Sequence, residues 1–144
     1  MKRVTSLANP VVKHIRSLYL RKGRERAKMA VLEGTRLIQD GMARGVRFGE
    51  ALCSESFYQS ESGSMLICEL SAKGAEVILV PDSLIERISD TETPQGIIAS
   101  IAIEEPSISE VFFDLSRLFL ILDGVQDPGN VGTLIRTGAA AGVG

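Results

Sequence analysis

Residues 118–142 read LFLILDGVQDPGNVGTLIRTGAAAG, and this stretch decides the fold class. Its first five residues, 118–122, are all apolar, which is typical of a central parallel strand that is buried on both faces. Residues 123–129 predict a loop, and Asn130 is expected to begin a helix with an apolar side. The order of strand, glycine-rich loop and helix indicates an α/β domain.

The loop at 123–129 is expected to lie where ligands bind in open α/β sheets, at the carboxyl ends of the strands. Glycines permit close backbone approach, and a helix N-terminus favours anions such as phosphate. The GxxxxGK[ST] pattern of P-loops is absent, and so is the GxGxxG pattern of dinucleotide sites. The residues alone therefore predict a loop near a phosphate or nucleotide and leave the reaction open.

The order of residues in this segment is similar to the first conserved motif of the SpoU (TrmH-like) family of RNA 2′-O-ribose methyltransferases. Asn130 is followed by a glycine after two residues and by Arg136 after six, and small residues fill the next turn. The family's catalytic domain is a SPOUT domain, a knotted Rossmann-like fold. The resemblance implies that residues 117–144 are the first strand and helix of that domain.

Earlier segments resemble the family's L30e-like RNA-binding domain. They are SLANPVVK at 6–13, the Glu-Gly pair at 33–34 before a helix, and TPQG at 93–96 before a strand. Together with the segment at 118–142, these marks span essentially the whole chain. The resemblance implies an RNA substrate-binding domain over residues 1–103, followed by a linker over 104–116.

The periodicity of the first 103 residues predicts an α/β layer structure, because strand and helix patterns alternate, and the L30e-like resemblance implies that it has three layers. Strands are expected at 29–32, 48–53, 77–80 and 97–103, and helices at 10–22, 35–44 and 65–73. Asp82 or Ser83 is expected to cap a further short helix that carries Leu84, Ile85 and Ile88. Asn9 and Pro10 predict the start of the first helix. Residues 54–64 predict a loop or a short helix.

The resemblance implies methyl transfer from S-adenosylmethionine to a ribose 2′-hydroxyl, on ribosomal or transfer RNA. Arg136 matches the family's catalytic arginine and Asn130 its companion asparagine. Because a guanidinium stays protonated, holding the adjacent phosphate and orienting the nucleophilic oxygen is the expected role of Arg136. Plainer roles remain open: Asn130 as a helix cap, and Arg136 as a solvated helix residue.

Charge is distributed unevenly along the 144 residues, although the net charge is only −2. Residues 1–36 carry ten Lys and Arg against two acids, whereas the other 108 carry six against sixteen. A basic front end predicts a polyanionic partner, most simply RNA. The alternative is that these cations pair with the protein's own acids. The expected RNA-binding residues are Lys13, Arg16, Arg21, Lys22, Arg24 and Arg26.

Other classes of protein and site are disfavoured by the sequence. No apolar run is long enough for a membrane span and no signal peptide is recognisable, so a cytoplasmic protein is expected. Cys53 and Cys68 form no CxxC pair, and His14 is the single histidine. We therefore expect neither a disulfide nor a metal site.

Two further motifs of the family, which hold the cofactor in knotted loops, are absent from these 144 residues. The expectation is a fragment that retains RNA recognition, has no cofactor-binding residues and has no methyltransferase activity. The homodimer usual for the family would depend on the missing part of the catalytic domain. Two other functions remain open: a non-catalytic L30e-like RNA-binding module, and a small-molecule enzyme with a nucleotide-binding loop.

Overall fold

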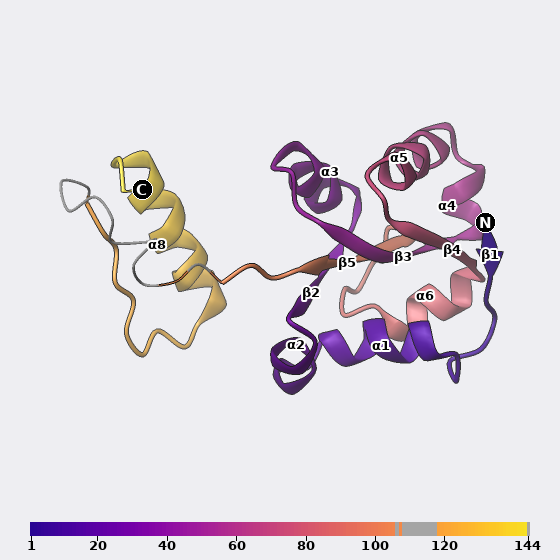
Figure 1. Ribbon diagram of the computed structural model, residues 1–144, viewed down its shortest axis with the longest axis horizontal. Helices are drawn as coiled ribbons and strands as arrows, with labels where there is room; N and C mark the ends of the chain where they lie inside the picture. Colours follow the sequence, from indigo (N-terminus) through magenta and orange to yellow (C-terminus); the bar gives the residue numbers. More distant parts are fainter. Residues whose placement is uncertain (106, 108–117, 144) are drawn as a thin grey trace. The chain divides into compact units, whose positions relative to one another are not determined.

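The computed structural model describes residues 1–105, 107 and 118–143 (Figure 1). The chain forms two compact units, 1–104 and 105–144. Most of the linker predicted over 104–116 lies outside the described residues.

The first unit is built on a mixed five-stranded sheet in the order β1-β4-β3-β5-β2. Its strands are β1 (Lys2–Arg3), β2 (Met29–Glu33), β3 (Phe48–Ser54), β4 (Glu76–Val80) and β5 (Ile97–Ala102). β4 pairs in parallel with β1 and β3, whereas β5 runs antiparallel to β3 and β2. The four predicted strands are confirmed; β1 was missed because its two residues are charged and carry no periodic signal.

Six helices cover the sheet: α1 (Pro10–Leu18), α2 (Arg21–Ala27), α3 (Thr35–Ala43), α4 (Glu55–Gln59), α5 (Glu61–Ala72) and α6 (Asp82–Ile88). α1 and α6 pack against one face, and α3 and α5 against the other (Figure 1). The predicted α/β class with three layers is therefore confirmed.

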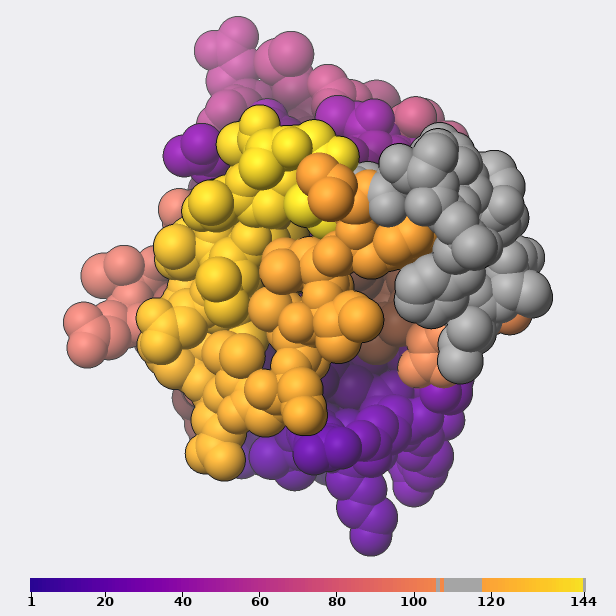
Figure 2. Space-filling view, turned by 90° about the vertical axis from the view of Figure 1, so that its left-hand side faces the viewer, coloured from indigo at the N-terminus to yellow at the C-terminus, as the bar shows by residue number. Residues whose placement is uncertain are grey.

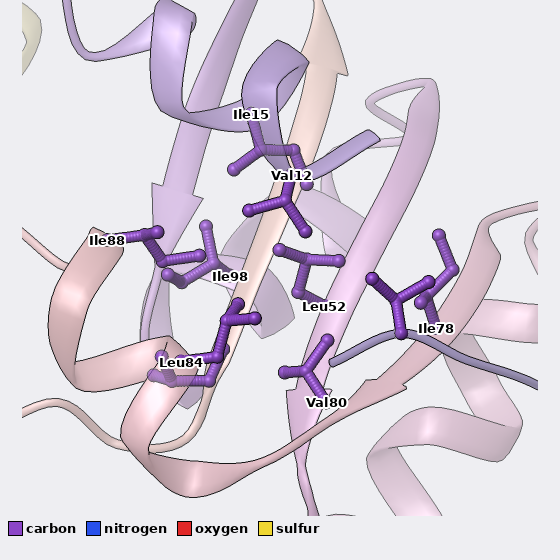
Figure 3. Close-up of a cluster of buried hydrophobic side chains, with 10 residues drawn as sticks. Val12, Ile15, Leu52, Ile78, Val80, Leu84, Ile88 and Ile98 are labelled. Atoms are coloured by element: carbon purple, nitrogen blue, oxygen red, sulfur yellow. The ribbon is translucent and has the colours of Figure 1, made fainter. Parts of the chain in front are cut away.

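Alternation along the strands divides the core between these two faces. Leu52 and Ile98 face the layer of α1 and α6, where they meet Val12 and Ile15 (Figure 3). Their neighbours point to the layer of α3 and α5, because successive side chains of a strand leave on opposite faces. Ala51, for example, packs in that second cluster. Central strands covered on both sides read as continuous apolar runs for this reason.

The helix predicted over 10–22 is wrong in extent, because the structure has two helices there. α1 ends at Leu18, and α2 begins at Arg21. Gly23 lies inside α2 rather than at a helix end, and a Cβ at this position would come within 2.0 Å of the Ser17 carbonyl oxygen. The glycine thus permits the close approach of two helices, and an interior glycine of this kind resembles a C-cap signal in sequence.

The region 54–72 is also more helical than predicted. The Ser54 hydroxyl accepts a hydrogen bond from the Phe57 N–H, and the Ser60 hydroxyl accepts one from the Gly63 N–H. These two caps begin α4 and α5, so α5 starts at Glu61, ahead of the predicted Met65.

The second unit contains one helix among the described residues 118–143, α8 (Pro128–Ala140). The strand predicted at 118–122 is wrong: this segment makes only an isolated bridge between Leu118 and Val143. Ile121 is 80% exposed, although the apolar pattern indicated burial on both faces. A strand needs neighbours to pair with, and the described part of this unit supplies none. Figure 2 shows the described residues of this unit in orange and yellow.

Candidate nucleic-acid interface and active-site helix

The first group of predicted RNA-binding residues lies on the exposed side of α1. Val12 and Ile15 are buried against the sheet, whereas Lys13 and Arg16 are exposed. Neither of these two cations has a side-chain partner within the described part of the chain. The helical period therefore separates a core stripe from a cationic stripe on α1.

The cations of α2 have different environments. Lys22 and Arg26 are exposed and have no side-chain partner among the described residues. The Arg21 guanidinium donates to Glu25 at 2.7 Å, and this bond raises the pKa of Arg21. Arg24 instead turns toward α1.

Arg24 is a structural residue of the elbow between the two helices. Its guanidinium donates to the carbonyl oxygens of Leu18, at 3.1 Å, and Tyr19, at 2.8 Å. These carbonyls belong to the last turn of α1, where no intrahelical donor is available. Arg24 was predicted to bind RNA, but its side chain already binds these two carbonyl oxygens. Both hydrogen bonds would be lost if the side chain turned outward to contact RNA.

The alternative in which the basic front end pairs with the protein's own acids holds for Arg21 and Arg3. Arg21 pairs locally with Glu25, and Arg3 pairs with Glu55. Lys13, Arg16, Lys22 and Arg26 make no such pair among the residues that the structure describes. Four exposed cations on two adjoining helices remain available to a polyanion.

Glu33, for which the sequence predicts no role of its own, is the centre of a hydrogen-bond network. Its carboxylate accepts bonds from the hydroxyls of Tyr19, at 2.6 Å, and Thr91, at 2.8 Å, and from the Ser89 hydroxyl. Burial alone would raise the pKa of Glu33, but the bonds from Ser89, Tyr19 and Thr91 outweigh it and lower the pKa. Burial and the neighbouring Glu33 raise the pKa of Tyr19.

The network fastens the loop between α6 and β5 to the end of β2. A second fastening comes from Gln95, whose side-chain oxygen accepts bonds from the Thr35 backbone N–H, at 2.9 Å, and hydroxyl, at 3.0 Å. Gly34 adopts φ +90° beside this amide, a conformation that other residues rarely adopt. The Glu-Gly pair at 33–34 and the TPQG segment at 93–96 therefore meet in space; their spacing in sequence gave no sign of this.

A small polar cavity of about 250 Å³ lies next to this loop. It is lined by residues at the carboxyl ends of β3 and β4 and by the TPQG segment. Ser56 donates to Asp82 across the cavity wall, and this bond lowers the pKa of Asp82. The Asp82 carboxylate thus holds Ser56 of α4 against the start of α6, so it has a structural role.

In the second unit, α8 begins earlier than predicted. Asp127 is the residue that caps it: the Asp127 carboxylate accepts a bond from the Gly129 N–H at 3.0 Å. The expectation that Asn130 begins the helix is therefore wrong, and so is its plainer reading as a cap. Asn130 lies in the first turn with an exposed side chain.

Arg136 is exposed and lies back along the helix toward that turn. Its guanidinium donates to the Thr133 hydroxyl at 3.3 Å. A Cβ at Gly132 would come within 3.2 Å of the guanidinium nitrogen, so the glycine leaves room for this side chain. Gly138 differs, because a Cβ there would meet Leu120. The structure thus exposes the Asn130 amide in the first turn of α8 and the Arg136 guanidinium beside Gly132 and Thr133, and no hydrogen bond joins these two side chains within the described part of the chain.

The described residues, 1–105, 107 and 118–143, contain no candidate metal site, no disulfide and no candidate membrane span. They contain no group of three or more His, Cys, Asp or Glu side chains arranged to hold a metal. Cys53 and Cys68 are free thiols, and burial raises the pKa of Cys53 to about 11. No helix in this part of the chain has the length and apolarity to cross a bilayer.

Comparison with known proteins identifies relatives along the whole chain. A family model described as the MRM3-like substrate binding domain matches residues 9–99. An uncharacterized tRNA/rRNA methyltransferase of Synechocystis is 35% identical over 97% of this chain and 50% of its own length. The 23S rRNA (guanosine(2553)-2′-O)-methyltransferase RlmP of Bacillus subtilis is 29% identical over 99% of this chain and 52% of its own length.

Solved structures show the same similarity. The AdoMet-bound rRNA methyltransferase from Sinorhizobium meliloti is 30% identical, with a TM-score of 0.80 over 99% of this chain and 52% of that protein. A solved RNA 2′-O ribose methyltransferase is 28% identical, with a TM-score of 0.73 over 98% of this chain and 53% of that protein. The chain spans about half the length of the curated relatives and solved structures that it matches.

Proposed function

The chain belongs to the MRM3-like substrate binding domain family, and from this premise we propose that it is the RNA-recognition part of an rRNA or tRNA ribose 2′-O-methyltransferase. The similarity to SpoU-type rRNA and tRNA methyltransferases over the whole chain supports a role in RNA methylation. In this proposal, residues 1–103 recognise RNA, and residues 117–144 contribute to the catalytic unit.

The observation that carries the catalytic part of this proposal is the exposed pair of side chains on α8. Asp127 caps the helix, so Asn130 is not needed for that purpose. Within the described part of the chain, Arg136 makes one long hydrogen bond, to Thr133, and its other donors have no partner there. A guanidinium has five donors in a planar fork, which suits the oxygens of a phosphate.

We propose that Arg136 binds the phosphate next to the target ribose and orients the 2′-hydroxyl, with Asn130 as its companion. The guanidinium would act as a fixed cation rather than as a base, because a guanidinium stays protonated in proteins. Correct orientation of a reacting group contributes up to roughly 7–11 kcal/mol to catalysis. The 2′-hydroxyl is also the group that distinguishes RNA from DNA.

For substrate recognition, we propose that the exposed cations of α1 and α2 bind the RNA backbone. These residues are Lys13, Arg16, Lys22 and Arg26, with smaller contributions from Arg21 and Arg24, which have partners within the fold. The loop over 89–96, fastened by Glu33 and Gln95, would present a fixed surface beside the backbone-binding helices.

S-adenosylmethionine is the methyl donor that we propose for the whole protein, since an AdoMet-bound relative is among the similar structures. The described residues of the second unit do not by themselves fit this cofactor. The cavity beside α8, of about 470 Å³, is lined mostly by apolar side chains and has no polar side chain for the cofactor's amino and carboxylate groups.

We also propose that the whole protein is a homodimer, which would cover the exposed apolar side chains of this unit.

The test is methyl transfer by the whole protein from labelled S-adenosylmethionine to ribosomal and transfer RNA. A 2′-O-methyl group protects the adjacent phosphodiester from alkaline hydrolysis, so the labelled nucleotide should appear as an alkali-resistant dinucleotide. Arg136→Ala should lower kcat by more than tenfold, whereas Arg87→Ala, which alters an exposed arginine of the first unit, should not. Label that is released as mononucleotide would show methylation elsewhere than on the 2′-oxygen. Absence of transfer, with RNA binding retained, would favour a non-catalytic RNA-binding module.

A further inference from the structure

A second pair of arginines lies outside the basic front end, at the end of the sheet where β5 leaves it. The Ala102 N–H donates to the Arg47 carbonyl oxygen at 2.9 Å, and the Ile103 N–H donates to the Lys28 carbonyl oxygen at 2.8 Å. Arg47 and Lys28 therefore flank the last residues of β5 from its two sides. Two strand spacings separate them, about 10 Å.

Arg44 joins Arg47 through the turn between α3 and β3. The Val46 N–H donates to the Gly41 carbonyl oxygen at 3.0 Å, and the Gly45 N–H donates to that of Met42 at 3.2 Å. With Gly45 at φ +71°, this pattern is a Schellman motif. The backbone that carries both arginines is thus held by hydrogen bonds at each end, so the Cα atoms of Arg44 and Arg47 have fixed positions.

The side chains of Arg44 and Arg47 are exposed and have no ion-pair or hydrogen-bond partner among the described residues. They line a cavity of about 250 Å³ together with Val46, Ile101 and Glu104. Glu104 is close enough to line the same cavity, yet it forms no ion pair with either arginine within the described part of the chain. Two unpaired guanidinium groups beside one cavity form a site for an oxyanion.

We propose that Arg44 and Arg47 bind phosphate groups of the RNA substrate and extend the cationic surface of α2 to the point where the chain leaves β5. This inference rests on the proposed function. The end of α2 supports it, because Lys28, which follows α2 directly, flanks β5 opposite Arg47. RNA bound along α2 would pass this sheet end, from which the chain continues to the catalytic unit (Figure 1).

The helix C-terminus gives Arg44 a plainer role, since a cation there is stabilised by the dipole of α3. This role does not extend to Arg47, which lies three residues beyond the cap. It also leaves the donors of both guanidinium groups available. An experiment must therefore separate RNA binding from the stability of α3.

The test measures affinity for a single-stranded rRNA fragment at several salt concentrations, with the 144-residue chain and with the double variant Arg44→Gln/Arg47→Gln. Each phosphate contact contributes about 0.7 to the slope of log affinity against log salt for single strands. The double variant should flatten the slope by about 1.4, as two such contacts require. Arg44→Lys/Arg47→Lys should keep the slope and lose affinity, because lysine retains the charge and not the bidentate fork.

Arg87→Gln is the matched control. Arg87 is exposed in the last turn of α6, so its loss removes one charge from a helix C-terminus, as loss of Arg44 does. Its slope should equal that of the wild type. If the double variant keeps the wild-type slope while the wild type binds RNA, the inference is overturned and the proposed function stands. If the wild type binds no RNA, the proposed function fails and the inference fails with it.

Discussion

The side-chain oxygen of Gln95 caps the first turn of α3, sixty residues away in sequence, by accepting hydrogen bonds from the backbone N–H and the hydroxyl of Thr35. The N-cap residue itself, Gly34, has no side chain for this purpose. A loop residue thus supplies what a local Ser or Asp supplies in other helices. The same contact holds the TPQG loop to the end of β2.

Replacing Gln95 with alanine should destabilise the first unit by about 1 kcal/mol, the usual effect of losing a helix N-cap. Gln95→Glu should retain most of the stability, because a carboxylate accepts the same bonds and suits the positive end of α3. Urea unfolding followed by circular dichroism measures both. Gln39→Ala on the exposed side of α3 is the control and should change stability by less than about 0.5 kcal/mol.

Variants of Arg24 and Lys22 should differ in their effects on stability and on RNA binding. Arg24→Gln should lower the free energy of unfolding by about 1–2 kcal/mol, since two carbonyl oxygens at the end of α1 lose a charged donor. Lys22→Gln should leave stability unchanged and weaken RNA binding. Thermal melts and gel shifts on both variants check this, and equal stability of the two proteins would contradict the structural role of Arg24.

Glu33 should make stability depend on pH. Its pKa is lowered in the folded state, so its contribution is fully present above about 4.3, the pKa of an unfolded glutamate, and is lost as the pH falls through the lowered value. The difference in unfolding free energy between wild type and Glu33→Gln should therefore be largest near neutral pH and shrink below about pH 4.

The control for this titration is Glu69→Gln, on the exposed side of α5. Glu69 makes no side-chain hydrogen bond among the described residues, so its variant should track the wild type at every pH. A difference for Glu33→Gln that stays constant from neutral to acid pH would show that the hydrogen-bond network does not favour the ionised carboxylate.

The 144-residue chain should not bind S-adenosylmethionine measurably. A cofactor site usually encloses most of the ligand and offers a few fixed polar groups. The cavity beside α8 is mostly apolar, and residues such as Ile121 and Ile135 are more than half exposed. Calorimetric titration with the cofactor should give no saturable heat, and a micromolar dissociation constant would refute this expectation.

Periodicity and turn chemistry were enough to predict four of the five strands of the first unit and the starts of α1 and α3. The strands that carry Leu52 and Ile98 are covered by helices on both faces of the sheet, and continuous apolar runs are typical of such strands. The elbow at Gly23 was not predictable, because its glycine is required by contact with Ser17 rather than by a local helix end. The meeting of Glu33 with Thr91 depends on strand pairing across the sheet, which spacing alone does not reveal.

In the second unit, the sequence predicted a strand that the structure does not contain. Its residues 118–122 have the composition of a buried strand, yet in this chain they are exposed, since a strand forms only against neighbours. The position of Asn130 was predicted as a site residue from its order relative to Arg136. Asp and Asn are both good capping residues, so the sequence could not decide whether Asp127 or Asn130 caps α8. The structure shows that Asp127 is the cap.

The most direct test of RNA recognition by the first unit is the affinity of the 144-residue chain for single-stranded rRNA between about 50 and 200 mM salt. Four exposed cations on α1 and α2, each contributing about 0.7 to the slope, should by themselves account for a loss of roughly fiftyfold over that range. The variant Lys13→Gln/Arg16→Gln/Lys22→Gln/Arg26→Gln should lose most of this dependence. Affinity that stays constant across the salt range, or a variant that binds as the wild type does, would contradict the account.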